Sequence, residues 1–264
     1  MGGGSLVCVG TGMLLGGHLT PRARHEIEHA DVVHALVYDG LFEVWLRQLN
    51  PRLESLQVFY QEGASRRASY DRMVEALVTS AAAGLRTCGA FYGHPGVFAR
   101  VPHEAVRLAR ARGLDAQLDP GISAEDCLYA DLGLDPGDFG CQHYEANQFL
   151  LYRRRIDPAA LLILWQVGVV GDQTLARRST APEYRQLLVE VLCQDYPAQH
   201  PVTLYRAASS PLVPAAIRHL PLADLPHVEV DQTDTLVVPP AQAMQPDPER
   251  QARLQALHRR LRPA

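Results

Sequence analysis

The first half of the chain alternates short apolar runs with glycine turns and amphipathic segments, and this order constrains the fold most strongly. The run at residues 5–10, for example, is rich in valine and leads directly into Gly10-Thr11-Gly12. Such alternation is typical of a parallel sheet with helices on its faces, where ligands bind at the carboxyl ends of the strands. Strands are expected at 5–10, 31–36, 56–60, 87–92 and 115–118, and helices at 21–29, 39–49, 69–83, 102–111 and 123–131.

The second half has longer connections and predicts a separate, mixed sheet. Its strands are expected at 161–165, 202–205, 228–230 and 234–238. A terminal helix is expected at 246–262, with Asp247 as its cap. We therefore expect an α/β fold of two subdomains, at 1–123 and 124–245, followed by a C-terminal helix at 246–264.

The chain of 264 residues contains no lysine, and all 25 of its basic residues are arginine. This composition excludes Schiff-base chemistry and the phosphate-loop lysine. The net charge of -4 predicts neither a nucleic-acid surface nor a basic membrane anchor. No apolar run is long enough to cross a bilayer, and no signal peptide is evident, so we expect a cytoplasmic protein.

The cysteines predict reduced thiols and no metal site. Their number is odd and their spacing irregular, and neither CxxC nor HExxH occurs. The five are Cys8, Cys88, Cys127, Cys141 and Cys193.

Two loops and one turn follow predicted strands. The turn at Gly10 would need a third glycine to bind a dinucleotide, but Leu15 stands there, so a NAD site is not expected. The loop at 92–98, YGHPGVF, is a rigid connection that lets a ligand approach its backbone. In the loop at 120–123, PGIS, Ser123 either caps the next helix or leaves helix N–H groups for a ligand. Each is also compatible with a purely structural turn.

Tyr60, Arg66 and Tyr70 bring two phenols and a guanidinium into one short segment. An arginine lowers the pKa of a nearby phenol because it favours the phenolate, which suits proton transfer. The alternative is a solvated pair, Arg66 and Arg67, beside two tyrosines that pack at the surface.

Together these motifs resemble the tetrapyrrole, or class III, methyltransferases. The resemblance covers VGxG, YGHPGVF, PGISAEDCLYADLGLDPG and YEA, and it extends through WQVG at 165–168 and TLVVPP at 235–240. His94 stands where that superfamily has an aspartate. The strings at 92–98, 123–133 and 144–146 are similar to the borosin peptide α-N-methyltransferases, within the same superfamily.

The resemblance implies S-adenosylmethionine as the methyl donor, bound in the cleft between the subdomains, with S-adenosylhomocysteine as the product. It implies no metal. It places Tyr60, Arg66 and Tyr70 in the catalytic pocket, where either tyrosine is a candidate base. The implied cofactor contacts and their neighbours are Gly10, Tyr92, His94, Val97, Phe98, Ser123, Ala124, Gln166, Tyr205, Ala207 and Thr235.

Two departures refine the expectation. Gln57 stands where fused fungal members have a further tyrosine, so any role of that tyrosine is absent or taken by another group. No apolar core-peptide run follows Pro240, so the chain resembles the split bacterial type, which methylates a separate ribosomally made precursor peptide. A homodimer in a 2:2 complex with that precursor is expected.

Three other functions compete with this one. They are a corrin or porphyrin C-methyltransferase, a catalytically silent peptide-binding partner, and a NAD-dependent enzyme.

Overall fold

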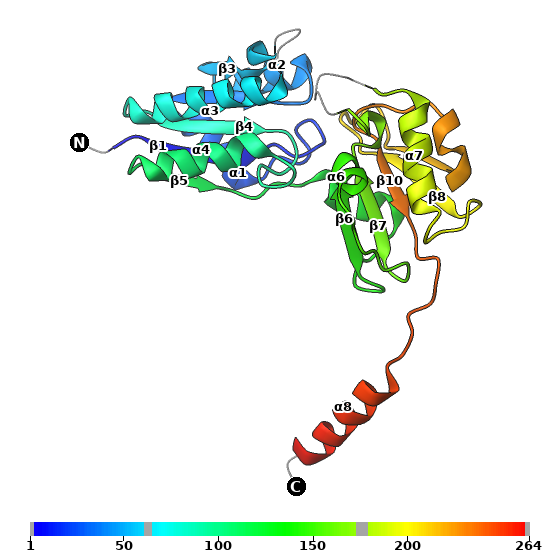
Figure 1. The fold of residues 1–264 in the computed structure, drawn as a ribbon. Helices are drawn as coiled ribbons and strands as arrows, with labels where there is room; N and C mark the ends of the chain where they lie inside the picture. The colour runs from blue at the N-terminus through cyan, green and yellow to red at the C-terminus, as the bar shows by residue number, and fades with distance from the viewer. Residues whose placement is uncertain (1–2, 61–64, 173–178, 262–264) are drawn as a thin grey trace.

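The computed structural model describes residues 3–60, 65–172 and 179–261, which form two five-stranded sheets and a separate C-terminal helix (Figure 1). The first sheet has the order β3-β2-β4-β1-β5, and every pairing in it is parallel. Its strands are β1 (Ser5–Gly10), β2 (Val32–Leu36), β3 (Leu53–Ser55), β4 (Arg86–Phe91) and β5 (Asp115–Leu118).

Two pairs of helices cover the faces of the first sheet. On one face, α3 and α4 bury Met73, Leu77 and Val101, and on the other, α1 and α2 bury Ile27 and Phe42. Burying each such side chain stabilises the fold by roughly 1.5–3 kcal/mol. The helices are α1 (Pro21–His29), α2 (Gly40–Leu49), α3 (Arg66–Ala82) and α4 (Arg100–Ala111).

Local capping sets the helix starts. The Thr20 side chain accepts a hydrogen bond from the backbone N–H of Ala23, with Pro21 as the first helical residue, as the sequence predicts. The Asp39 side chain caps α2 in the same way.

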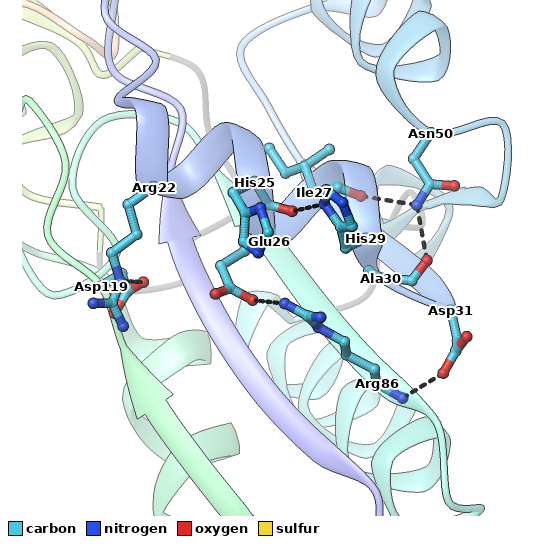
Figure 2. Close-up of polar contacts among 10 residues, drawn as sticks. All are labelled: Arg22, His25, Glu26, Ile27, His29, Ala30, Asp31, Asn50, Arg86 and Asp119. Carbon is cyan, nitrogen blue, oxygen red and sulfur yellow. Dashed lines mark hydrogen bonds and ion pairs between the residues drawn. The ribbon is translucent and has the colours of Figure 1, made fainter.

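Polar contacts then tie α1 to the sheet (Figure 2). Glu26 pairs with Arg86 at the start of β4, and Arg22 pairs with Asp119 directly after β5 at 2.6 Å. The second contact fixes the chain where it enters the loop at 120–123.

The second sheet is mixed, with the order β6-β7-β10-β8-β9, as expected. Only β6 and β7 pair in parallel. The α5 face of this sheet buries Leu128 with Ile163, and the opposite face packs against α6 and α7. The elements are α5 (Ala124–Leu132), β6 (Cys141–Glu145), α6 (Ala146–Leu151), β7 (Leu161–Trp165), α7 (Pro182–Leu192), β8 (Pro201–Arg206), β9 (Ala216–Pro221) and β10 (Thr235–Val238).

One predicted strand of the first sheet is wrong. Residues 56–60 were expected to be extended, but the strand is β3 and a 3-10 helix, η1 (Leu56–Phe59), follows it. The Ser55 side chain accepts from the Gln57 N–H, and the Gln57 side-chain amide donates to Val37 O at 2.8 Å. The first of these bonds is local and the second reaches a residue distant in sequence, and together they favour the turn over the β-prone sequence.

The helix predicted at 69–83 begins three residues earlier than expected. The sequence predicts a polar loop at 61–68, but Ser65 caps α3 and residues 66–68 form its first turn, so this part of the prediction is wrong. Residues 61–64 lie outside the described residues.

The second sheet departs further from expectation. Residues 228–230 are not a strand. The edge strands β6 and β9 and the helices α6 and α7 were not predicted. The first four residues of β9 are all exposed, so its sequence lacks the alternating apolar pattern of a half-buried strand.

The terminal helix, α8 (Pro248–Leu261), forms as predicted, and the Asp247 side chain accepts from the Arg250 N–H. It stands apart from both sheets at the end of an extended segment and buries no residue (Figure 1). In the described part of the chain, no helix has the length and apolar character needed to span a bilayer. The proposed boundaries of the subdomains remain predictions.

Candidate active site

Three loops meet at the carboxyl edge of the first sheet and form a floor of backbone atoms. A Cβ atom added at Gly121 would lie 2.7 Å from Gly93 O and 2.8 Å from Gly10 Cα. Gly93 also donates to Gly12 O at 2.9 Å. Since no side chain fits between these loops, glycine is required for their close approach. We call Gly10, Gly93 and Gly121 the glycine floor.

The loop after β4 rises from this floor. His94 Nδ1 accepts a hydrogen bond from the Gly96 N–H at 2.9 Å, so the neutral imidazole carries its hydrogen on Nε2. Val97 is half-buried and donates its N–H to His94 O. Phe98, at the end of the loop, has a φ of 48° and is 54% exposed.

The start of α5 completes this edge. The Ser123 hydroxyl accepts from the Asp126 N–H, and Asp126 Oδ2 accepts from the Ser123 N–H at 2.7 Å, which forms a capping box. The capping interpretation of Ser123 is therefore confirmed. Ala124 is the first helical residue, where backbone N–H groups lack intrahelical acceptors and can face a ligand.

The predicted residues of the second sheet also gather at one edge. Because β10 runs antiparallel to β7 and β8, Thr235 begins its strand where the other two end. Gln166 follows β7, and Ala207 follows β8. Thr235 pairs with Tyr205 in the sheet and is buried.

Tyr205 supports the fold at this edge. Its hydroxyl donates to Asp131 Oδ2 on α5 at 2.7 Å, and burial followed by this hydrogen bond raises the pKa of the phenol. This bond holds the side chain against α5, and the place of Tyr205 beside the cofactor remains a prediction.

The two edges contact each other. The Phe98 ring lies 5.7 Å from the ring of Trp165 and 5.9 Å from that of His143, between centroids. Phe98 and Gln166, with φ of 48° and 59°, are the two non-glycine residues of positive φ in the described part of the chain. Such strained conformations cluster at ligand sites, and both residues belong to the predicted cofactor set.

The tyrosines and the arginine predicted to be catalytic also come together. The rings of Tyr60 and Tyr70 lie edge to face, 6.3 Å apart, and their phenols are hydrogen-bonded. Arg66 and Tyr70 stand four residues apart on α3, so they share one face of the helix. The Arg66 guanidinium acts electrostatically on the phenols of both Tyr60 and Tyr92. Tyr92 thus links this tyrosine cluster to the loop after β4.

The electrostatics of Tyr60 differ from the expectation. Tyr60 is 42% exposed, yet desolvation at its phenol is the largest influence and raises the pKa; the interactions with Tyr70 and Tyr92 act in the same direction. Arg66 lowers the pKa but is outweighed. Tyr60 therefore keeps its proton at neutral pH and is a hydrogen-bond donor.

Sequence reasoning missed Tyr38 and Trp165. Tyr38 is half-buried just beyond β2 and interacts electrostatically with the Tyr92 phenol. Tyr38 follows a strand of the parallel sheet, and this position alone predicts a place near the ligand-binding edge. Trp165 lies within a quoted motif but received no role.

These features fit an adenosyl cofactor. The glycine floor lets a ligand approach the backbone, and the buried Trp165 Nε1 has no partner among the described residues. Gln166, Thr235 and Ala124 would hold such a ligand from the second sheet and α5, and His94 and Val97 from the first sheet. In the described residues, no group of three or more His, Cys, Asp or Glu side chains is placed to bind a metal.

Comparison with known proteins identifies the family. The sequence profile of the tetrapyrrole (corrin/porphyrin) methylases matches residues 5–226. The chain belongs to this family. In the crystal structure of uroporphyrin-III C-methyltransferase from Thermus thermophilus, the same fold covers 90% of this chain and 92% of that one, with a TM-score of 0.63 and 24% identity. Cobalt precorrin-4 methyltransferase gives a TM-score of 0.62 over 89% of this chain and 94% of its own, at 14% identity.

Curated relatives are more similar in sequence. A fungal protein from Coprinopsis marcescibilis, named a methyltransferase and ribosomally synthesized type I borosin cyclic peptide precursor, is 40% identical over 210 residues, which cover 79% of this chain and 54% of the relative. The corresponding omphalotin A precursor from Omphalotus olearius is 40% identical over 208 residues, which cover 79% of this chain and 50% of the relative. The chain thus spans about half the length of these relatives. Their names join methyltransferase and precursor in one protein, and the split bacterial type remains a prediction.

Proposed function

We propose that this chain is an S-adenosylmethionine-dependent methyltransferase that methylates backbone amide nitrogens of a peptide. The observation that carries the proposal is the convergence of Tyr60, Arg66 and Tyr70 with Tyr92 beside the glycine floor. The names of the borosin relatives support a peptide acceptor.

The difficulty of the reaction lies in the acceptor. The lone pair of an amide nitrogen is delocalised into the carbonyl group, so the nitrogen is a poor nucleophile until its proton is lost. Bound S-adenosylmethionine supplies an activated methyl group on a sulfonium sulfur. The protein must therefore remove one proton and stabilise the negative charge that develops on the amide.

The tyrosine cluster divides these tasks. Tyr60, which keeps its proton, donates a hydrogen bond to the Tyr70 oxygen. Tyr70 then accepts the amide proton as the general base. Arg66, on the same face of α3, stabilises the phenolate and the developing amide oxyanion. Holding the peptide nitrogen in line with the methyl carbon adds the advantage of proximity.

The acceptor is proposed to be a separate precursor peptide, and the enzyme a homodimer that binds two such peptides. The exposed helix α8 supports the dimer. Leu254, Leu257 and Leu261 recur at spacings of three and four, so they line one face of a helix with no buried residue. An apolar stripe of this kind gains stability when a second copy covers it.

The dimer is tested by light scattering on a size-exclusion column. The native protein is expected to have the mass of a dimer, and Leu257→Glu to shift it towards the monomer. Arg253→Glu, an exposed charge change on the same helix, is the control.

The function is tested by intact mass spectrometry. A candidate precursor peptide is incubated with the protein and S-adenosylmethionine, and fragmentation locates any added mass. Additions in steps of one methylene on backbone nitrogens, made to a peptide supplied in trans, would support both the reaction and the separate acceptor. Cofactor binding without peptide methylation, together with a copurifying tetrapyrrole chromophore, would instead favour corrin or porphyrin C-methylation.

A further inference from the structure

One buried polar atom beside the cleft has no role in the fold. Trp165 ends β7 and is 7% exposed, and its indole Nε1 has no hydrogen-bond partner among the described residues. Native proteins leave few buried N–H groups unpaired, because such a group loses its bonds to water without compensation. An N–H kept in this state in an apolar wall points to an acceptor that arrives from outside the chain.

No described atom accepts a hydrogen bond from Trp165 Nε1. It packs under α5 with Leu128, Ile163 and Val237, all apolar. The nearby Tyr205 hydroxyl is already committed to Asp131.

Towards the first sheet, Trp165 is covered by the ring of Phe98, 5.7 Å away. Phe98 itself is 54% exposed and holds a positive φ of 48°. A phenylalanine in this conformation is strained, so a change of its backbone to a relaxed conformation recovers part of that energy. The ring that covers the indole is thus both exposed and strained.

A second unpartnered atom provides a contrast. The Tyr196 hydroxyl is also buried without a partner, but it belongs to the core on the opposite face of the second sheet, against α7. Trp165, in contrast, directly precedes Gln166 at the edge that faces the glycine floor.

We propose that Trp165 Nε1 donates a hydrogen bond to an oxygen or nitrogen acceptor of the bound adenosyl cofactor, once Phe98 turns away from the indole. This inference rests on the proposed function, since it takes the cofactor to be S-adenosylmethionine or its product. Trp165 is then a ligand-binding residue of the second sheet, and Phe98 is a cover that the ligand displaces.

Nuclear magnetic resonance of the indole N–H tests the contact directly. The chain has two tryptophans, so Trp45→Phe leaves Trp165 as the one indole. Trp45 lies on α2, outside the proposed site. Titration of this variant with S-adenosylhomocysteine is expected to move the Trp165 N–H resonance downfield and to slow its hydrogen exchange. Saturation of the protein by calorimetry with an unmoved resonance would overturn the inference and leave the cofactor assignment standing.

Affinity gives a second measurement. Trp165→Phe removes the donor and is expected to raise the Kd for S-adenosylhomocysteine about 3- to 10-fold, as for the loss of one hydrogen bond. Trp45→Phe is expected to leave the Kd unchanged. An unchanged Kd in Trp165→Phe contradicts the inference. If the native protein does not bind S-adenosylhomocysteine at all, the proposed cofactor fails and this inference fails with it.

Discussion

The two sheets present different edges to the space between them. The first offers the glycine floor and, beside it, three phenols and a guanidinium from Tyr60, Tyr70, Tyr92 and Arg66. The second offers an indole, a buried threonine and a strained Gln166. In the proposed mechanism, the first sheet therefore supplies the groups for proton transfer, and both sheets contribute to ligand binding.

Removal of the proposed base should have the largest effect. Tyr70→Phe and Arg66→Ala are expected to lower methylation at saturating substrate by about 100-fold or more, the usual contribution of a general base. Their Kd for S-adenosylhomocysteine should stay near that of the native protein. Single-turnover rates and calorimetry would separate the two quantities. Full-rate methylation by both variants would contradict the assignment of proton transfer to Tyr70 and Arg66 of the first sheet.

The glycine floor should be the next most sensitive feature. Gly121→Ala places a Cβ against Gly93 O and Gly10 Cα, and we expect overpacking of about 1–3 kcal/mol in the free energy of unfolding, with weaker cofactor binding. Gly40→Ala is the matched control, because nothing lies within 4 Å of its Cβ position and it begins a helix. Denaturant unfolding of both variants would measure the difference. Equal free energies of unfolding for the two variants would mean that the loops at Gly10 and Gly93 can shift to accommodate the added Cβ atom at little cost.

A smaller effect is expected at Gln166. Gln166→Gly removes the strain of the left-handed backbone, so the ligand-free protein should be no less stable. Loss of the side-chain amide should nevertheless raise the Kd for S-adenosylhomocysteine about 3- to 10-fold. Gln166→Asn, which tolerates the same backbone, tests whether amide reach matters. If Gln166→Gly binds S-adenosylhomocysteine as tightly as the native protein does, the Gln166 side chain does not contribute to binding.

The smallest effect concerns the pH dependence of the first sheet. His34 on β2 is buried, and this burial lowers the pKa of its imidazole despite the opposing influence of Glu54. Between its ordinary pKa of 6.5 and the lower folded value, the unfolded chain binds more protons. The contribution of neutral His34 to the free energy of unfolding is therefore complete above pH 6.5. It is lost as the pH falls from 6.5 through the lower pKa of the folded state.

Unfolding by denaturant at several pH values tests the prediction. His34→Gln should flatten the loss of stability below pH 6.5, whereas His258→Gln, an exposed change on α8, should not. His18, whose pKa burial also lowers, leaves part of the native slope in place. A slope unaffected by His34→Gln would contradict the assignment.

The first sheet was largely predictable because its signals are local. Thr20 with Pro21 and the valine-rich run before Gly10 each define an element through neighbouring residues. Residues 56–60 failed because a bond between Gln57 and Val37, distant in sequence, outweighs β-propensity. In the second sheet, the first four residues of β9 are exposed and show no strand pattern. This segment is a strand because it pairs with β8.

The predicted site residues owed more to family resemblance than to local pattern. The fold places Tyr60, Arg66 and Tyr70 together, which their spacing alone left open. It also shows that Ser123 and Tyr205 are committed to Asp126 and Asp131. Trp165 was not predictable, because a missing hydrogen-bond partner is visible only in three dimensions.

The glycine floor has a consequence for how such a protein changes over time. In the proposed binding mode the ligand rests on main-chain atoms shared by three loops, so the side chains around it can vary without removing that support. One fold can then keep the same binding site for the methyl donor while the residues that bind the acceptor change. The family model is that of the corrin and porphyrin methylases, and relatives of this chain are named as cyclic peptide precursors, so such a floor is compatible with different acceptors.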